Sequence, residues 1–87
     1  MNDQESQLIH AFSRNPNEKI HLAVRKYKGK FYVDLRLWFQ TKDDPTFRPT
    51  KKGVSFHMGH LPELSRGVTR LMEIRGRFPD EAAIAVQ

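Results

Sequence analysis

Residues 20–39, IHLAVRKYKGKFYVDLRLWF, decide the fold, because apolar and polar side chains alternate on both sides of a Lys28-Gly29 pair. A period of two is typical of β-strands, since successive side chains point to opposite faces of a sheet. Gly29 can adopt the positive φ that a tight two-residue turn requires. The stretch therefore predicts a β-hairpin with one apolar face, made by Ile20, Leu22, Val24, Phe31, Val33, Leu35, Leu37 and Phe39.

Two further strands are expected after this hairpin. Residues 47–52 would form an irregular third strand, in which Pro49 lacks an amide donor and so suits a sheet edge. Gly53 then leads into residues 54–56, a short fourth strand. The sequence thus predicts a four-stranded antiparallel, curved sheet.

From Leu61 the apolar spacing becomes helical, and it continues until Gly76 and Pro79 end the element. The predicted fold is therefore α+β, with one C-terminal α-helix in the order β-β-β-β-α. A helix this short cannot cover a four-stranded sheet, so the leftover apolar surface predicts a homodimer. The residues expected at the dimer interface are Leu64, Val68, Leu71 and Met72.

The chain of 87 residues predicts one small domain. Residues 1–17 are polar and end in the breaker run Asn15-Pro16-Asn17, which indicates a flexible N-terminal arm. Residues 18–76 would form the binding domain and residues 77–87 a C-terminal tail. The absence of a long apolar run predicts an intracellular protein with no membrane partner.

The basic residues are concentrated in one segment. Between Arg14 and Lys52 lie 11 of the 15 Lys and Arg residues and four acids, a net charge of 11 − 4 = +7. Cations follow phosphates, and the rings beside them can stack on bases that no partner strand covers. Lysines can also guard an exposed sheet edge against aggregation, but their clustering around Tyr27 favours an unpaired nucleic-acid strand.

The aromatic residues of the second predicted strand divide between its two faces. Phe31 and Phe39 share the apolar face and are expected in the core, whereas Tyr32 and Trp38 share the other face with Lys30 and Arg36. That second face suits nucleic acid, or equally a packed surface such as a dimer or partner interface.

Catalysis and metal binding are not expected. His57 and His60 lie close in sequence, but no third ligand is spaced to complete a metal site with them. The sequence lacks cysteine, a glycine-rich phosphate loop, a nucleophile with its base and a carboxylate cluster. We therefore expect no enzyme, no cofactor and no small-molecule substrate.

Two motifs resemble the positive cofactor 4 family of single-stranded-DNA-binding transcriptional coactivators. The first is Lys28-Gly29-Lys30 followed by Val33-Asp34-Leu35-Arg36-x-Trp38, and the second is Lys51-Lys52-Gly53-Val54-Ser55-Phe56. The resemblance extends from about Lys19 to Met72. It implies an obligate homodimer whose two β-ribbons hold unpaired DNA through backbone charges and ring stacking.

The resemblance also implies which residues face the DNA. They are Arg25, Tyr27, Lys28, Lys30, Arg36, Phe39 and Lys51, to which the charge and ring pattern adds Lys26, Trp38, Arg48 and Lys52. For Phe39 the family conflicts with the alternation, which places this ring in the core. The sequence departs from the family pattern in two places. Trp38-Phe39 stands where the family usually has a Tyr-Trp-like pair, and residues 57–62 replace the usual Asn-Pro-Glu-x-Trp opening of the helix.

The predicted function is largely sequence-independent binding of single-stranded DNA. A bacterial or phage-like member, in the cytoplasm or nucleoid, fits as well as a nuclear eukaryotic one. The alternatives are an RNA-binding protein, since stacking barely distinguishes the two sugars, and a protein-interaction module that uses the Tyr32/Trp38 face.

Overall fold

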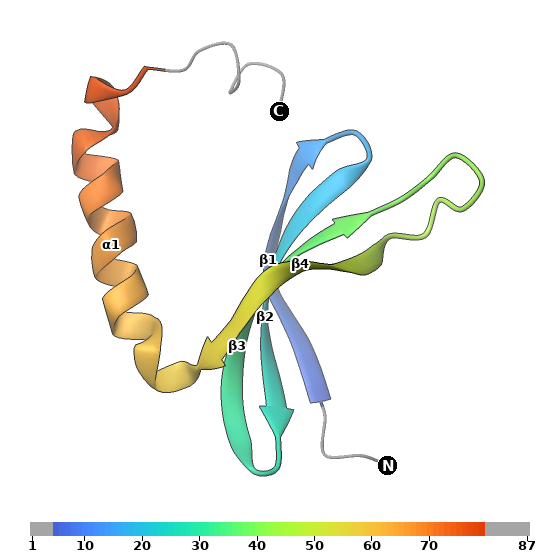
Figure 1. Ribbon diagram of the computed structural model, residues 1–87, viewed down its shortest axis with the longest axis horizontal. Coiled ribbons are helices and arrows are strands. Elements are labelled where there is room, and N and C mark those ends of the chain that lie inside the picture. Colours follow the sequence, from blue (N-terminus) through green and yellow to red (C-terminus); the bar gives the residue numbers. More distant parts are fainter. Residues whose placement is uncertain (1–4, 80–87) are drawn as a thin grey trace.

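The computed structural model describes residues 5–79, which form a four-stranded antiparallel sheet followed by a helix. The strands β1 (Glu5–Asn15), β2 (Glu18–Tyr27), β3 (Lys30–Phe39) and β4 (Arg48–His57) lie side by side in chain order. The sheet is strongly twisted, and the helix stands beside it rather than across it (Figure 1). The predicted β-β-β-β-α order is therefore confirmed.

The β2–β3 hairpin forms as predicted. Its register is unbroken over ten pairs, from Glu18 opposite Phe39 to Tyr27 opposite Lys30. Lys28 (φ 52°) and Gly29 (φ 79°) both have positive φ, as a type I′ turn requires. This turn matches the right-handed twist of its strands, so the hairpin can extend as a free ribbon from the sheet.

Strand β1 contradicts the prediction of a flexible arm over residues 1–17, of which residues 1–4 lie outside the described part. Glu5–Asn15 pairs along β2, and Pro16 and Asn17 form the connecting turn. The Asn15 carboxamide stabilises this turn, because it accepts a bond from the Asn17 amide and donates one to Glu18. The register shifts twice along the pair, which breaks the simple alternation that would have revealed the strand.

The predicted third and fourth strands are one continuous strand, β4, with an irregularity inside it. The register shifts between the partners of Arg36 and Trp38, and Pro49 lies at the sheet edge as expected. Beyond the shift, β4 approaches β3 so closely that a Cβ at Gly53 would lie 2.7 Å from the Leu35 carbonyl oxygen. Only glycine fits there, so Gly53 belongs inside the strand rather than between two strands.

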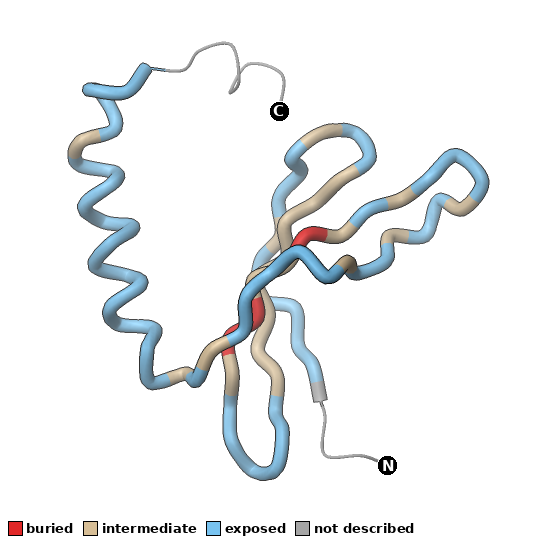
Figure 2. Tube along the Cα trace, viewed as in Figure 1, coloured by how far each residue is buried: buried red, intermediate tan, exposed pale blue. Residues whose placement is uncertain are grey.

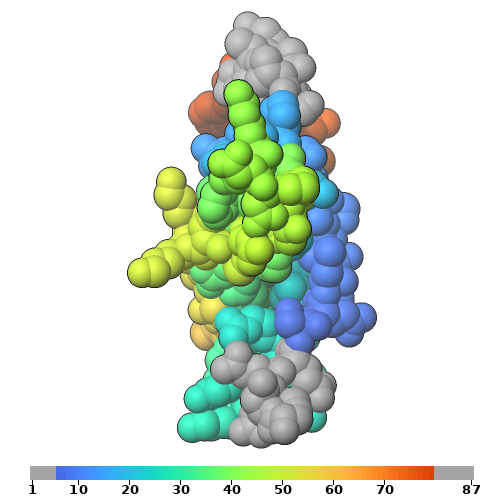
Figure 3. Space-filling model, turned by 90° about the vertical axis from the view of Figure 1, so that its right-hand side faces the viewer, coloured from blue at the N-terminus to red at the C-terminus, as the bar shows by residue number. Residues whose placement is uncertain are grey.

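The core is thin. Among the described residues, only Val33, Leu37 and the polar Asp34 are buried, all on β3 at the centre of the sheet (Figure 2). The radius of gyration is 15.4 Å, compared with about 12 Å expected for a compact chain of this length. The shortest extent is 18 Å, and in the edge-on view of Figure 3 side chains of β4 (yellow) project from one broad face of the molecule.

Helix α1 (Leu61–Ile74) begins where the sequence predicts, after a short 3₁₀ turn, η1 (Met58–His60). A second 3₁₀ turn, η2 (Arg75–Arg77), follows it, so the α-helix ends slightly before Gly76. No residue of α1 is buried. Its apolar stripe is therefore open to solvent, and it comprises Leu61, Leu64, Val68, Leu71 and Met72.

The expectation that Phe31 and Phe39 lie in the core is wrong, since they are 50% and 38% exposed. Both share the side of Val33 and Leu37, but they stand at the two ends of β3. Helix α1 does not pack over that side, so nothing within the described part of the chain encloses these rings.

Candidate functional site

One face of the sheet collects most of the predicted binding residues, and we call it the basic face. Directly paired residues of an antiparallel sheet project to the same side. The pairs are Tyr27 with Lys30, Arg25 with Tyr32, His21 with Arg36 and Lys19 with Trp38. The predicted grouping of Lys30, Tyr32, Arg36 and Trp38 is therefore correct, and Arg25 and Tyr27 join them from β2.

The tip of the β2–β3 hairpin combines cations and rings in the open. All residues from Lys26 to Phe31 are exposed, and the tip projects from the lower edge of the sheet (Figure 1). The Lys28 ammonium lies 5.2 Å from the centre of the Tyr27 ring. Lys26 pairs with Phe31, so it faces the opposite side, with its ammonium 5.8 Å from the Phe31 ring. The tip thus presents charge and aromatic surface on both sides.

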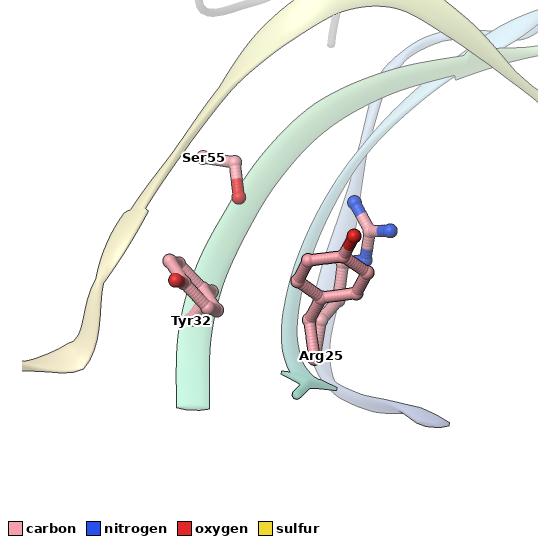
Figure 4. Close-up of a pocket in the computed structure, with 4 residues that line it drawn as sticks. Arg25, Tyr32 and Ser55 are labelled. Carbon is pink, nitrogen blue, oxygen red and sulfur yellow. The ribbon is translucent and has the colours of Figure 1, made fainter. Parts of the chain in front are cut away.

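A hollow opens on the basic face next to the tip. It has a volume of about 280 Å³ and is lined by Arg25 and Tyr27 of β2, Tyr32 of β3 and Ser55 of β4. Figure 4 shows Arg25, Tyr32 and Ser55 on three neighbouring strands. No sequence pattern pointed to Ser55 as a lining residue, and the alternation placed Tyr32 on this face without revealing the hollow. The two-residue turn fixes Arg25 opposite Tyr32, so that pair could have been found.

Lys51 lies on the basic face, within the irregular part of β4. It lines a second hollow there together with Arg25, Arg36, Trp38 and other residues. The irregular backbone is held by Thr50, whose hydroxyl donates to the Leu37 carbonyl and accepts from the Lys52 amide. The Lys51 charge therefore stands beside the charges of the hairpin strands.

The other two basic residues of β4 are placed differently. Arg48 pairs with Phe39, away from the basic face, and its guanidinium donates to the Asp44 carboxylate at 2.8 Å. This bond lowers the pKa of Asp44. Lys52 is exposed on the edge strand. Both residues remain predicted contacts, but neither lies in the hollows described above.

Phe39 lies at the other end of the sheet from the hairpin tip. It lines a hollow with the β1–β2 turn, which includes Pro16 and Asn17. Gln40 connects the same turn to the end of β3, because its backbone N–H donates a hydrogen bond to the Asn17 carbonyl at 2.9 Å. Phe39 therefore lies on the apolar side, as the alternation predicts, and its ring is accessible. Its contact with DNA stays a prediction.

Trp38 is already stacked within the chain. Its ring lies 4.4 Å from that of His21 and nearly parallel to it. Burial, aided by the charge of Lys19, lowers the pKa of His21, so the imidazole is neutral at physiological pH. One face of the Trp38 ring is covered by His21, so only its other face can stack on a ligand.

Arg36 is tied into the sheet. Its guanidinium donates two bonds to the Asp34 carboxylate, at 2.9 and 3.1 Å, and one to the Thr50 carbonyl. The bonds to Asp34 raise the pKa of Arg36. Three of its five N–H donors are therefore engaged within the sheet, two with Asp34 of β3 and one with Thr50 of β4. Arg36, a predicted DNA contact, thus also stabilises the sheet.

Arg36→Ala is expected to lower the free energy of unfolding by up to about 3 kcal/mol, because it leaves the buried Asp34 carboxylate without a partner. The side chains of Asp34 and Arg36 are only 9% and 21% exposed. Urea unfolding measures the change. Combining Arg36→Ala with Asp34→Asn should recover part of the loss, since the unpaired charge is then gone. A double variant less stable than the single one would refute this reading of the pair.

No other kind of site is evident in residues 5–79. They contain no group of three or more His, Cys, Asp or Glu side chains able to hold a metal ion. His57 accepts a hydrogen bond from the Gly59 amide at 3.0 Å, and it thereby caps η1. Within the same range, no helix has the length and apolar character needed to cross a bilayer.

Comparison with known proteins gives the following matches. The family model described as Transcriptional Coactivator p15 (PC4) matches residues 14–66. A PC4 homolog from Burkholderia pseudomallei is 26% identical in sequence, with a TM-score of 0.70. The match covers 78% of this chain, and 90% or 98% of that chain in its two crystal forms.

A second similar structure is the bacteriophage T5 homolog of the eukaryotic transcription coactivator PC4, described as implicated in recombination-dependent DNA replication. It is 21% identical, with a TM-score of 0.53 over 86% of this chain and 81% of that chain. At this identity the likeness shows the fold alone. A search of curated proteins gives no match.

Proposed function

The chain belongs to the transcriptional coactivator p15 (PC4) family, and from this premise we propose that it is a homodimeric protein that binds single-stranded DNA. Binding is largely independent of sequence, since charges follow the phosphates and rings stack on the bases. The protein is not an enzyme and uses no cofactor. It acts inside the cell, on nucleic acid in the cytoplasm, nucleoid or nucleus.

One observation carries this proposal, namely the gathering of rings and cations on the basic face. Arg25, Tyr27, Lys30 and Tyr32 share that face in a single register, and Lys51 joins them from β4. Rings beside cations on an open face suit a strand whose bases are uncovered. In a duplex the same bases are stacked and paired, so the rings would contribute nothing.

The homodimer is supported by surface that one chain leaves uncovered. The apolar stripe of α1 has no buried residue, and Leu71 and Met72 are 62% and 55% exposed. Apolar patches of this kind on a small domain mark an interaction surface. A second copy is the simplest occupant, because two identical stripes can cover each other around a two-fold axis.

A fluorescence-anisotropy titration tests the function. We expect oligo-dT to bind more tightly than a duplex of the same length, and its affinity to fall steeply as salt increases. Equal affinity for both forms would reject the single-strand proposal. An RNA of matched sequence, included in the series, would reveal a ribose preference. Binding to none of the three would favour a protein-interaction module.

A further inference from the structure

A row of hollows runs along the basic face, away from the hairpin tip. The hollow at the tip and the one lined by Lys51 share Arg25. The hollow lined by Lys51 in turn shares Ser6 and Asp34 with another of about 270 Å³, which we call the His21 hollow after the histidine in its wall. The surface open to a bound strand therefore extends as far as His21, a residue that neither the charge pattern nor the family resemblance assigns to DNA.

His21 is held in place by its neighbours in the sheet. Its ring stacks on that of Trp38, with 4.4 Å between the ring centres and 16° between the planes. It stands directly opposite Arg36 of β3 on one side and Ala11 of β1 on the other. The imidazole is partly exposed, so its edge can meet a ligand in the His21 hollow while one face stays against Trp38. A side chain fixed in this way loses little freedom on binding.

The charges that face His21 are mostly positive. They are Lys19 from β2, Asp34 and Arg36 from β3, and Lys51 from β4. Asp34 is the only acid among them, and Arg36 neutralises its charge through two hydrogen bonds. The residues that β1 places on this face carry no ionisable group, and they are Ser6, Leu8, Ala11 and Ser13. A phosphate near His21 would thus meet attraction and no unpaired carboxylate from these neighbours.

The same surroundings decide when the imidazole carries a charge. Burial and the charge of Lys19 lower the pKa of His21, so the free protein binds a proton there only weakly. A phosphate in the His21 hollow reverses this balance, because an opposite charge within about 4–6 Å favours the charged form. The added proton also turns both ring nitrogens into donors. Strand and proton therefore each favour the binding of the other.

We propose that His21 is a further DNA-binding residue, which contacts a phosphate of the bound strand in its protonated form and so links strand binding to proton uptake. The inference rests on the proposed function and deepens it, because it adds a contact to that site and a way to regulate it. Affinity rises as the pH falls, until His21 is protonated in the free protein as well. We expect a gain of about tenfold between about pH 8 and pH 5.

Anisotropy titrations of oligo-dT at several pH values and constant salt measure this gain in the full-length protein. His21→Phe keeps a ring against Trp38 but takes up no proton, so its affinity should hardly change with pH. His60→Phe is the matched control, because His60 is exposed and its ring lies beside Phe56, on the opposite side of the sheet. This variant should keep the gain of the unaltered protein.

NMR titration of the four histidine side chains gives a second measurement, which does not depend on affinity. The resonance that is missing from His21→Phe identifies His21, and saturating oligo-dT should move its protonation to higher pH. An affinity that does not change with pH, an equal gain in His21→Phe, or a His21 titration unmoved by the strand would overturn the inference and leave the proposed function intact. If the unaltered protein binds no oligo-dT at any pH, the proposed function itself fails.

Discussion

Val68→Asp is expected to convert the proposed dimer into a monomer. Val68 lies in the middle of the exposed stripe of α1 and is 50% exposed in the single chain. Burial of one such side chain contributes about 1.5–3 kcal/mol, and two-fold symmetry makes each substitution act twice. The dissociation constant should therefore rise about thousandfold, which sedimentation equilibrium can measure.

Thr69→Asp is the matched control, because it places the same charge on the neighbouring residue, away from the apolar stripe. It should leave the dimer intact. Circular dichroism should confirm that both variants keep the helix. A Val68→Asp protein that still sediments as a dimer would show that α1 is not the interface.

Replacing Lys28, Lys30 and Lys51 together with alanine is expected to weaken oligo-dT binding about hundredfold near 0.1 M salt. Lys28 and Lys30 stand at the exposed hairpin tip, and Lys51 lines the second hollow of the basic face. Each phosphate contact contributes about 0.7 to the slope of log K against log salt for single strands. The slope should thus become shallower by about two for each chain.

The control removes the same number of charges elsewhere. Arg66 and Arg70 on α1 and Arg77 in η2 are exposed and lie outside the sheet. Their replacement with alanine changes the net charge equally, but the salt slope should stay close to that of the unaltered protein. Equal effects of the two triple variants would mean that overall charge, and not the basic face, attracts the strand.

The β2–β3 hairpin could be predicted from the sequence because everything that determines it is local. The alternation specifies which side chains share a face, and the Lys28-Gly29 turn sets the register between the strands. The start of α1 is equally local, since Leu61 and Pro62 mark it. The part of the basic face that β2 and β3 form followed from the alternation and the turn alone.

Strands β1 and β4 were harder to predict because each contains an irregularity. In β1 the extra residue Ile9 shifts the register, so apolar side chains no longer alternate. In β4 the role of Gly53 depends on how closely β3 approaches it, which is a contact between distant parts of the chain. Sequence alone showed a glycine and suggested a strand break.

The placement of Phe31 and Phe39 shows what alternation can and cannot establish. It correctly gave the side of the sheet on which each ring lies. It could not show whether another element covers that side, which depends on the position of α1. The pocket at Tyr32 escaped notice for a related reason, since it needs Ser55 from β4 as its third wall.

Native mass spectrometry of the protein mixed with oligo-dT, and separately with a duplex of equal length, tests the central proposal most directly. We expect a complex of two protein chains with one unpaired strand at low salt, and no comparable complex with the duplex. A complex of one chain with one strand, or equal occupancy of strand and duplex, would contradict it.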